Sequence, residues 1–75
     1  MATIRELVTG ARRTLTAAGL ASPGREAALL LGSLLELSEA QIRARDEQKI
    51  DERIASRYAK LVERRAAGEP AAYLL

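Results

Sequence analysis

The sequence predicts an all-α fold, a small bundle of four to five short helices that are largely antiparallel. Three observations support this prediction. Ala, Leu, Arg and Glu, which are strong helix formers, dominate the 75 residues, whereas β-branched residues are few. Apolar residues recur at helical spacing, and the segments between these runs are short, which favours antiparallel neighbours. A chain of this length forms one domain, so we expect residues 1–75 to be a single helical unit.

The first helix is predicted to run from about Thr3 to Ala18. Thr3 and Glu6 have the spacing of a capping box, in which each side chain binds a free amide at the start of the helix. Gly19 is expected to end the helix in the left-handed conformation, so that Leu20 folds back on the last turn.

The second helix is predicted to open at Ser22 and Pro23, as its cap and its first helical residue. The run that follows, residues 27–35, is apolar on nearly every side, so this helix should lie in the middle of the bundle. Gly32 inside it costs about 1 kcal/mol relative to Ala, and the expected reason is the close approach of a neighbouring helix.

A third, short helix is predicted from Ser38 to about Arg45. Ser38 and Gln41 form a second capping box, and Leu37 and Ile42 form a hydrophobic staple across it. Residues 46–50 read as a polar connection.

The fourth helix should begin near Asp51 and continue to about Ala67, where Gly68 ends it. A proline then stands where a new helix would begin, so residues 70–75 are expected to form a short fifth helix or its first turn. The apolar end of the chain is either a contact surface or packs on the bundle. The buried stripe of the fourth helix should contain Ile54, Tyr58, Leu61, Val62 and Ile50.

The composition argues against chemistry within this chain. It has neither Cys nor His, so a thiol nucleophile, a disulfide and the commonest general base are missing, and we expect no catalytic residue. A carboxylate cluster follows no known cation-binding spacing, so we expect no metal and assign the cluster to a helix dipole. That cluster comprises Asp46, Glu47, Asp51 and Glu52. The sequence has no membrane span and no signal peptide, which fits a cytoplasmic setting.

A basic stripe follows one face of the fourth helix at helical spacing. It is a candidate docking surface for an acidic protein or for RNA phosphates, and the alternative is an ordinary solvated face. Net charge is only +2 and no aromatic residues are interleaved, so we do not expect nucleic acid as a partner. The candidate partner-binding residues are Arg53, Arg57, Lys60 and Arg64.

Three segments carry a family resemblance. Arg64-Arg65-x-x-Gly68-Glu69-Pro70-x-x-Tyr73-Leu74 looks like the junction motif of the HemK/PrmC family, the glutamine methyltransferases of peptide-chain release factors. Thr3-Ile4-Arg5-Glu6-Leu7 resembles the family's opening, and Ala18-Gly19-Leu20-x-Ser22-Pro23-x-x-Glu26-Ala27-x-x-Leu30-Leu31 resembles its second-helix signature. Gly24 and Ala28 depart from the usual pattern of that helix.

The resemblance implies that this chain is the N-terminal helical domain of such an enzyme, and that it helps to recognise the release factor. The methyltransferase domain, which binds S-adenosylmethionine, would follow residue 75, so this chain should hold no cofactor and be inactive in isolation. Separately, we expect it to be a monomer. Its expected partners are a release factor and its own catalytic domain. The resemblance assigns an interdomain junction to Arg65, Gly68, Glu69, Pro70 and Tyr73. Two alternatives are a free-standing basic bundle that binds nucleic acid and a designed or model helical domain with no ligand.

Overall fold

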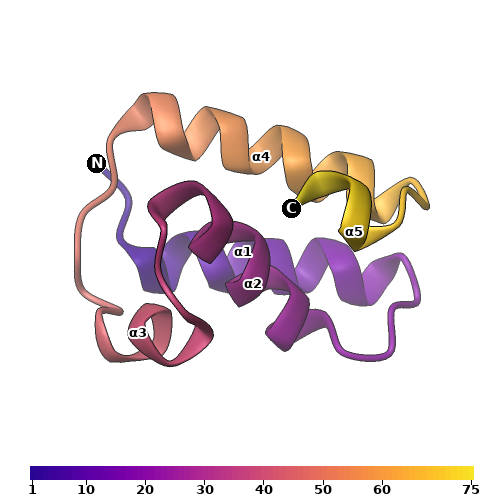
Figure 1. The fold of residues 1–75 in the computed structure, drawn as a ribbon, viewed down its shortest axis with the longest axis horizontal. Coiled ribbons are helices and arrows are strands. Elements are labelled where there is room, and N and C mark those ends of the chain that lie inside the picture. Colours follow the sequence, from indigo (N-terminus) through magenta and orange to yellow (C-terminus); the bar gives the residue numbers. More distant parts are fainter.

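A computed structural model describes all of residues 1–75 and confirms the predicted all-α class. It contains α1 (Ile4–Ala17), α2 (Pro23–Leu35), α3 (Glu39–Ala44), α4 (Glu52–Ala66) and α5 (Ala71–Leu74). The long helices α1 and α4 run in the same direction, and α2 runs back obliquely and packs against both (Figure 1). None of these helices combines the length and the apolar character that a membrane crossing requires.

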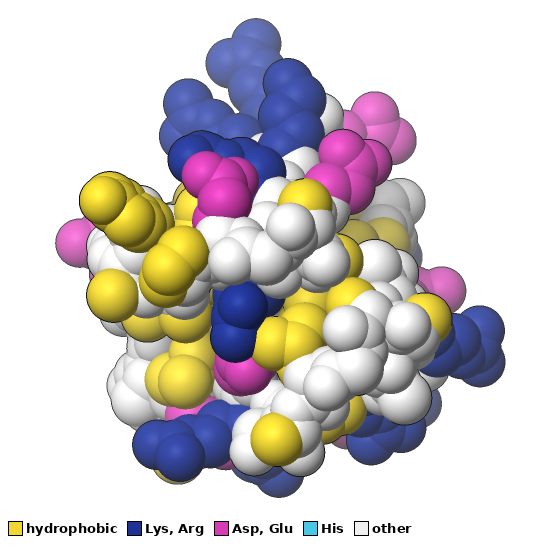
Figure 2. All heavy atoms as spheres, turned by 90° about the vertical axis from the view of Figure 1, so that its right-hand side faces the viewer, with side chains coloured by type: hydrophobic (Ala, Val, Ile, Leu, Met, Phe, Trp, Pro, Cys, Tyr) yellow, Lys and Arg dark blue, Asp and Glu magenta, His cyan; other side chains and the backbone are white.

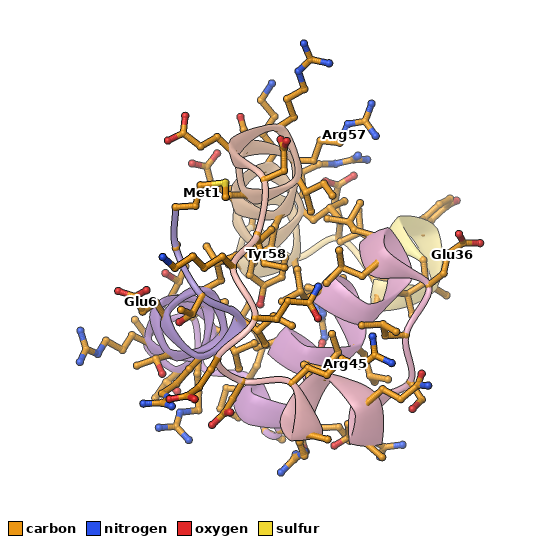
Figure 3. All side chains as sticks on the ribbon, turned by 90° about the vertical axis from the view of Figure 1, so that its left-hand side faces the viewer. Met1, Glu6, Glu36, Arg45, Arg57 and Tyr58 are labelled. Carbon is orange, nitrogen blue, oxygen red and sulfur yellow. The ribbon has the colours of Figure 1, made fainter.

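The predicted central position of the second helix is confirmed, because α2 contacts each of the other four helices. Tyr58 of α4 points into the bundle (Figure 3) and its hydroxyl donates a hydrogen bond of 2.8 Å to the Ala27 carbonyl of α2. Burial raises the pKa of the Tyr58 phenol, since ionisation would place a charge among apolar side chains. The buried core comprises Ile4, Ala11, Leu15, Ala27, Ala28, Leu30, Leu31, Ile42, Ile50, Tyr58 and Val62, whereas Ile54 and Leu61 are half-buried.

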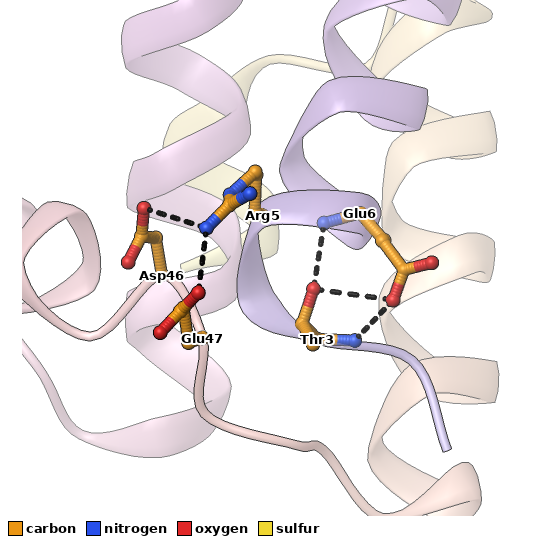
Figure 4. Close-up of polar contacts among 5 residues, drawn as sticks. All are labelled: Thr3, Arg5, Glu6, Asp46 and Glu47. Atoms are coloured by element: carbon orange, nitrogen blue, oxygen red, sulfur yellow. Dashed lines mark hydrogen bonds and ion pairs between the residues drawn. The ribbon is translucent and has the colours of Figure 1, made fainter.

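Both ends of α1 form as predicted. The Glu6 N–H donates to the Thr3 hydroxyl, and the Thr3 N–H donates to the Glu6 carboxylate at 2.9 Å, which completes the capping box (Figure 4). These bonds, with the Thr3 N–H contributing most, lower the pKa of Glu6. At the other end Gly19 has φ 85°, and the Leu20 N–H donates to the Leu15 carbonyl at 3.2 Å. This is the predicted left-handed reversal.

The second capping box, between Ser38 and Gln41, is also confirmed. As predicted, Ser22 is the cap residue of α2 and Pro23 its first helical residue, but the Ser22 side chain makes no capping hydrogen bond, unlike those of Thr3 and Ser38. The backbone explains the difference. Thr3 and Ser38 have ψ of 164° and 165°, the extended geometry that caps require, whereas Ser22 has ψ 63°.

The expectation of a neighbouring helix close to Gly32 needs correction. A Cβ added at Gly32 would lie 2.4 Å from the backbone oxygen of Leu37, whereas the nearest atom of α3, on Ile42, would lie 3.6 Å away. The close approach therefore comes from the chain's own turn after α2. Glu36 adopts a left-handed φ of 57° there, and the Leu37 N–H donates to the Gly32 carbonyl at 2.9 Å.

The connection at residues 46–50 is more than a polar link, because it pairs with the N-terminal segment. Thr3 and Lys49 form an isolated antiparallel bridge. Two amides of the first turn of α1, which have no partner within the helix, bind carbonyls of this connection. The hydrogen bonds between the two segments are Ile4 N to Gln48 O at 2.9 Å, Arg5 N to Asp46 O at 2.9 Å and Ile50 N to Ala2 O at 2.8 Å.

Candidate functional site

The predicted basic stripe lies on the outer face of α4. Lys and Arg side chains gather over this helix at the top of Figure 2, and Arg57 points away from the bundle in Figure 3. Arg53, Arg57 and Lys60 are exposed, and no carboxylate lies within 4.0 Å of any of them. These three cations, the α4 cations below, are neither buried nor neutralised, so their charge is available to a partner.

Arg64 belongs to the stripe by spacing but differs from the α4 cations, because it is neutralised. Its Nε donates to Glu69 Oε2 at 2.7 Å and its Nη2 donates to Glu69 Oε1 at 2.9 Å. This two-point bond raises the pKa of Arg64 and lowers the pKa of Glu69, since each charge stabilises the other. The sequence spacing could not reveal the pairing, because Glu69 lies beyond the end of the helix.

The turn after α4 brings Glu69 back to Arg64. Gly68 has φ 108°, a value that a residue with a Cβ rarely adopts. The Gly68 N–H donates to the Arg65 carbonyl at 3.1 Å, and the Glu69 N–H donates to the Arg64 carbonyl at 3.2 Å. Pro70 then precedes α5 as its N-terminal cap residue, one position earlier than a first helical residue.

Arg65 connects three parts of the bundle. Its Nε and Nη2 donate to the two carboxylate oxygens of Glu26 in the first turn of α2, and its Nη1 donates to the Glu69 carbonyl at 3.3 Å. The Arg65 and Glu26 side chains are only 20% and 18% exposed. We call Glu26, Arg64, Arg65 and Glu69 the junction network. The pairing of Glu26 was not predicted, although this residue lies in the second-helix signature and Arg65 lies in the junction motif.

The apolar end of the chain is expected either to form a contact surface or to pack on the bundle, and its residues are partly packed and partly exposed. Leu74 packs against the core, whereas Tyr73 and Leu75 are 83% and 61% exposed. The structure thus places Arg65, Gly68 and Glu69 in one hydrogen-bonded turn, from which α5 projects Tyr73 outward. Their role in orienting a second domain stays a prediction.

The carboxylate cluster is divided between two helix starts. Asp46 and Glu47 lie 3.4 Å and 3.2 Å from the Arg5 guanidinium beside the start of α1 (Figure 4). Asp51 accepts a hydrogen bond of 2.7 Å from the Arg53 N–H and caps α4. These carboxylates thus pair with an arginine or cap a helix, and the structure contains no group of three ligand side chains placed to hold a metal ion.

Two shallow hollows of opposite charge mark the surface. The first, of ≈ 220 Å³, lies among α1, α2 and α3 and is lined by Ile4, Arg5, Val8, Thr9, Arg12, Gly24, Ala28, Ile42, Arg43 and Asp46. The second, of ≈ 350 Å³, lies between α1 and α4 and has Glu6 and Glu63 among its lining residues, with no cation. We call them the basic hollow and the acidic hollow. Neither contains a glycine-rich turn after a strand of the kind that binds nucleotide-like cofactors.

The chain was compared with known proteins. A family profile described as the PrmC N-terminal domain matches residues 6–75. A release factor glutamine methyltransferase of Moorella thermoacetica is 38% identical over 72 residues, which cover 96% of this chain and 25% of that protein. The chain therefore spans a quarter of the length of this relative. No solved structure matches. Because the profile matches residues 6–75 and the relative is 38% identical over the 72 aligned residues, the chain belongs to the PrmC N-terminal domain family.

Proposed function

We propose that this chain is the N-terminal helper domain of a release factor glutamine methyltransferase, and that it binds the release factor rather than carrying out chemistry. The match to the PrmC N-terminal domain over residues 6–75 carries this proposal. Methyl transfer and the binding of S-adenosylmethionine belong, in this proposal, to the three quarters of the relative that this chain does not cover. We assign no step of the reaction to the chain.

The α4 cations are the proposed contact with the release factor. They form one exposed face without carboxylate partners, and such a face attracts an acidic surface and speeds its association. Arg64 is excluded from the contact because Glu69 already occupies its guanidinium. This charge arrangement favours a protein partner with an acidic patch, since no aromatic side chain lies among the cations to stack on bases.

The test measures binding of a bacterial release factor to this chain by isothermal titration calorimetry. Charge reversal at Arg53, Arg57 and Lys60 together should weaken the affinity by at least about tenfold, because each contact then becomes a repulsion. A matched control reverses Arg13, Arg45 and Lys49, which are also exposed and without carboxylate partners but lie outside α4. Equal losses in the two variants would show that only net charge matters and would refute the contact on α4.

A second titration tests the absence of chemistry. S-adenosylmethionine titrated into the chain should release no heat above that of dilution. Saturable binding would contradict the proposal, because it would place the cofactor in the helical domain. RNA is titrated into the chain in the same way. If RNA bound more tightly than the release factor, RNA would take the place of the release factor as the proposed partner.

A further inference from the structure

The basic hollow has the composition of a site for an acidic, partly apolar protein segment. Its base is formed by the apolar side chains of Ile4, Ala28 and Ile42, which are nearly fully buried. Three arginines stand around this base, two from α1 and one from α3, and Asp46 is its one carboxylate. An apolar base with a cationic rim fits a side chain that is itself apolar and has carboxylates beside it.

The arginines of the rim differ in how far they are neutralised. Arg5 is paired with Asp46 and Glu47, and Arg43 is paired with Glu39 at 2.8 Å. Arg12 has no carboxylate within 4.0 Å. Arg12 is therefore the one arginine of the rim whose charge no neighbour satisfies, and a carboxylate from outside the chain can bind it.

Gly24 leaves the space that Arg12 occupies. A Cβ at this position would lie 3.3 Å from Cδ of Arg12, which is tighter than an ordinary contact. The methylene chain of Arg12 therefore lies against the first turn of α2, where it extends the apolar base while its guanidinium remains at the rim.

We propose that the basic hollow binds an apolar side chain flanked by carboxylates, presented by an acidic helix of a partner protein, with Arg12 as the main ionic contact. No residue of α4 lines the basic hollow, so this site is separate from the α4 cations. The proposal goes beyond the proposed function and does not depend on it. The acidic hollow provides an internal comparison, because the same ligand should be repelled by Glu6 and Glu63.

The probe is a synthetic helical peptide of about 15 residues, with one leucine and with glutamates three and four residues from it on the same face. Titration into ¹⁵N-labelled chain should shift the amides around the basic hollow in a saturable way. The Arg12→Glu variant should bind at least about tenfold more weakly. The control Arg13→Glu changes the neighbouring exposed cation, which does not line the hollow, and should bind the peptide like the original chain.

Changes to the peptide test the two halves of the recognition. Replacing its leucine by serine, or its glutamates by glutamine, should each abolish saturable binding. Unchanged binding of the serine peptide would overturn the proposal, because charge attraction alone would then suffice. Shifts centred on Gly10 and Ala55 of the acidic hollow, or equal losses in Arg12→Glu and Arg13→Glu, would overturn it as well. Concentration-dependent shifts around the basic hollow without peptide would also do so, by showing a second copy of the chain as the occupant.

Discussion

The turns after α2 and after α4 share one hydrogen bond, from the residue after the left-handed one to the carbonyl five residues before it, but they are stabilised in different ways. Each contains one left-handed residue, Glu36 in the first and Gly68 in the second. The first turn packs a backbone carbonyl directly on Gly32, whereas the second is surrounded by the ion pairs of the junction network. The contact on Gly32 leaves room for glycine alone, whereas an ion pair of the junction network can be removed with only a partial loss of stability. Substitutions in the two turns should therefore differ in size and in sign.

The largest effect is expected for Gly32→Ala. The new methyl group would clash with the Leu37 carbonyl, and this should lower the free energy of unfolding by about 2–3 kcal/mol despite the better helix propensity of Ala. Thermal unfolding followed by circular dichroism measures the loss. Gly10→Ala is the matched control, because a Cβ there meets nothing within 4 Å, and it should stabilise the chain by about 1 kcal/mol. Equal effects in the two variants would contradict the close approach.

The second effect concerns the partly buried pair of the junction network. Glu26→Gln and Arg65→Met should each lower the free energy of unfolding by about 1–2 kcal/mol, because each leaves a polar partner with limited access to water. The double variant should lose less than the sum of the two, which urea denaturation can measure. Strict additivity would show that the two side chains do not interact.

A smaller effect of opposite sign is expected at Glu36. Glu36→Gly removes the strain of a left-handed residue with a Cβ and should stabilise the chain by up to about 1 kcal/mol, measured by urea denaturation. Gly68→Ala makes the reverse change in the other turn and should destabilise it by a similar amount. If both substitutions had the same sign, the turns would not share their backbone conformation.

The smallest effect is expected for the exposed pair of Arg64 and Glu69. Because Arg64 lowers the pKa of Glu69 below its ordinary value of 4.5, this pair should stabilise the fold above pH 4.5 and lose its contribution as pH falls through the lower, folded-state pKa. Glu69→Gln should reduce this part of the acid dependence, measured as stability between pH 7 and pH 2. An unchanged acid profile would show that the pair contributes nothing.

The features that sequence analysis predicted correctly are local ones. Thr3 and Glu6, or Ser38 and Gln41, are three residues apart, so their spacing alone specifies a helix start. Gly68 also predicts the end of α4 from local sequence, because the freedom of glycine at positive φ is a property of the residue itself.

The features that it missed depend on how distant segments meet. Arg65 and Glu26 are 39 residues apart, and Tyr58 and Ala27 are 31 residues apart, so no periodicity reveals these pairs. Glu36 has no residue-level signal for its left-handed φ, because the packing of the turn imposes it. For the candidate site, spacing identified the basic stripe, but it could not separate the α4 cations from Arg64 or predict either hollow.

The bridge between Thr3 and Lys49 has a consequence for how the starts of α1 and α4 move. The amides of Ile4, Arg5 and Ile50 are protected from exchange with solvent deuterium only while the N-terminal segment and the connection before α4 are joined. They should therefore exchange together, as one opening event. Amides that are far apart along the polypeptide would then exchange through a single local opening. Truncation of Ala2 and Thr3 would loosen the start of α4 as well as the start of α1.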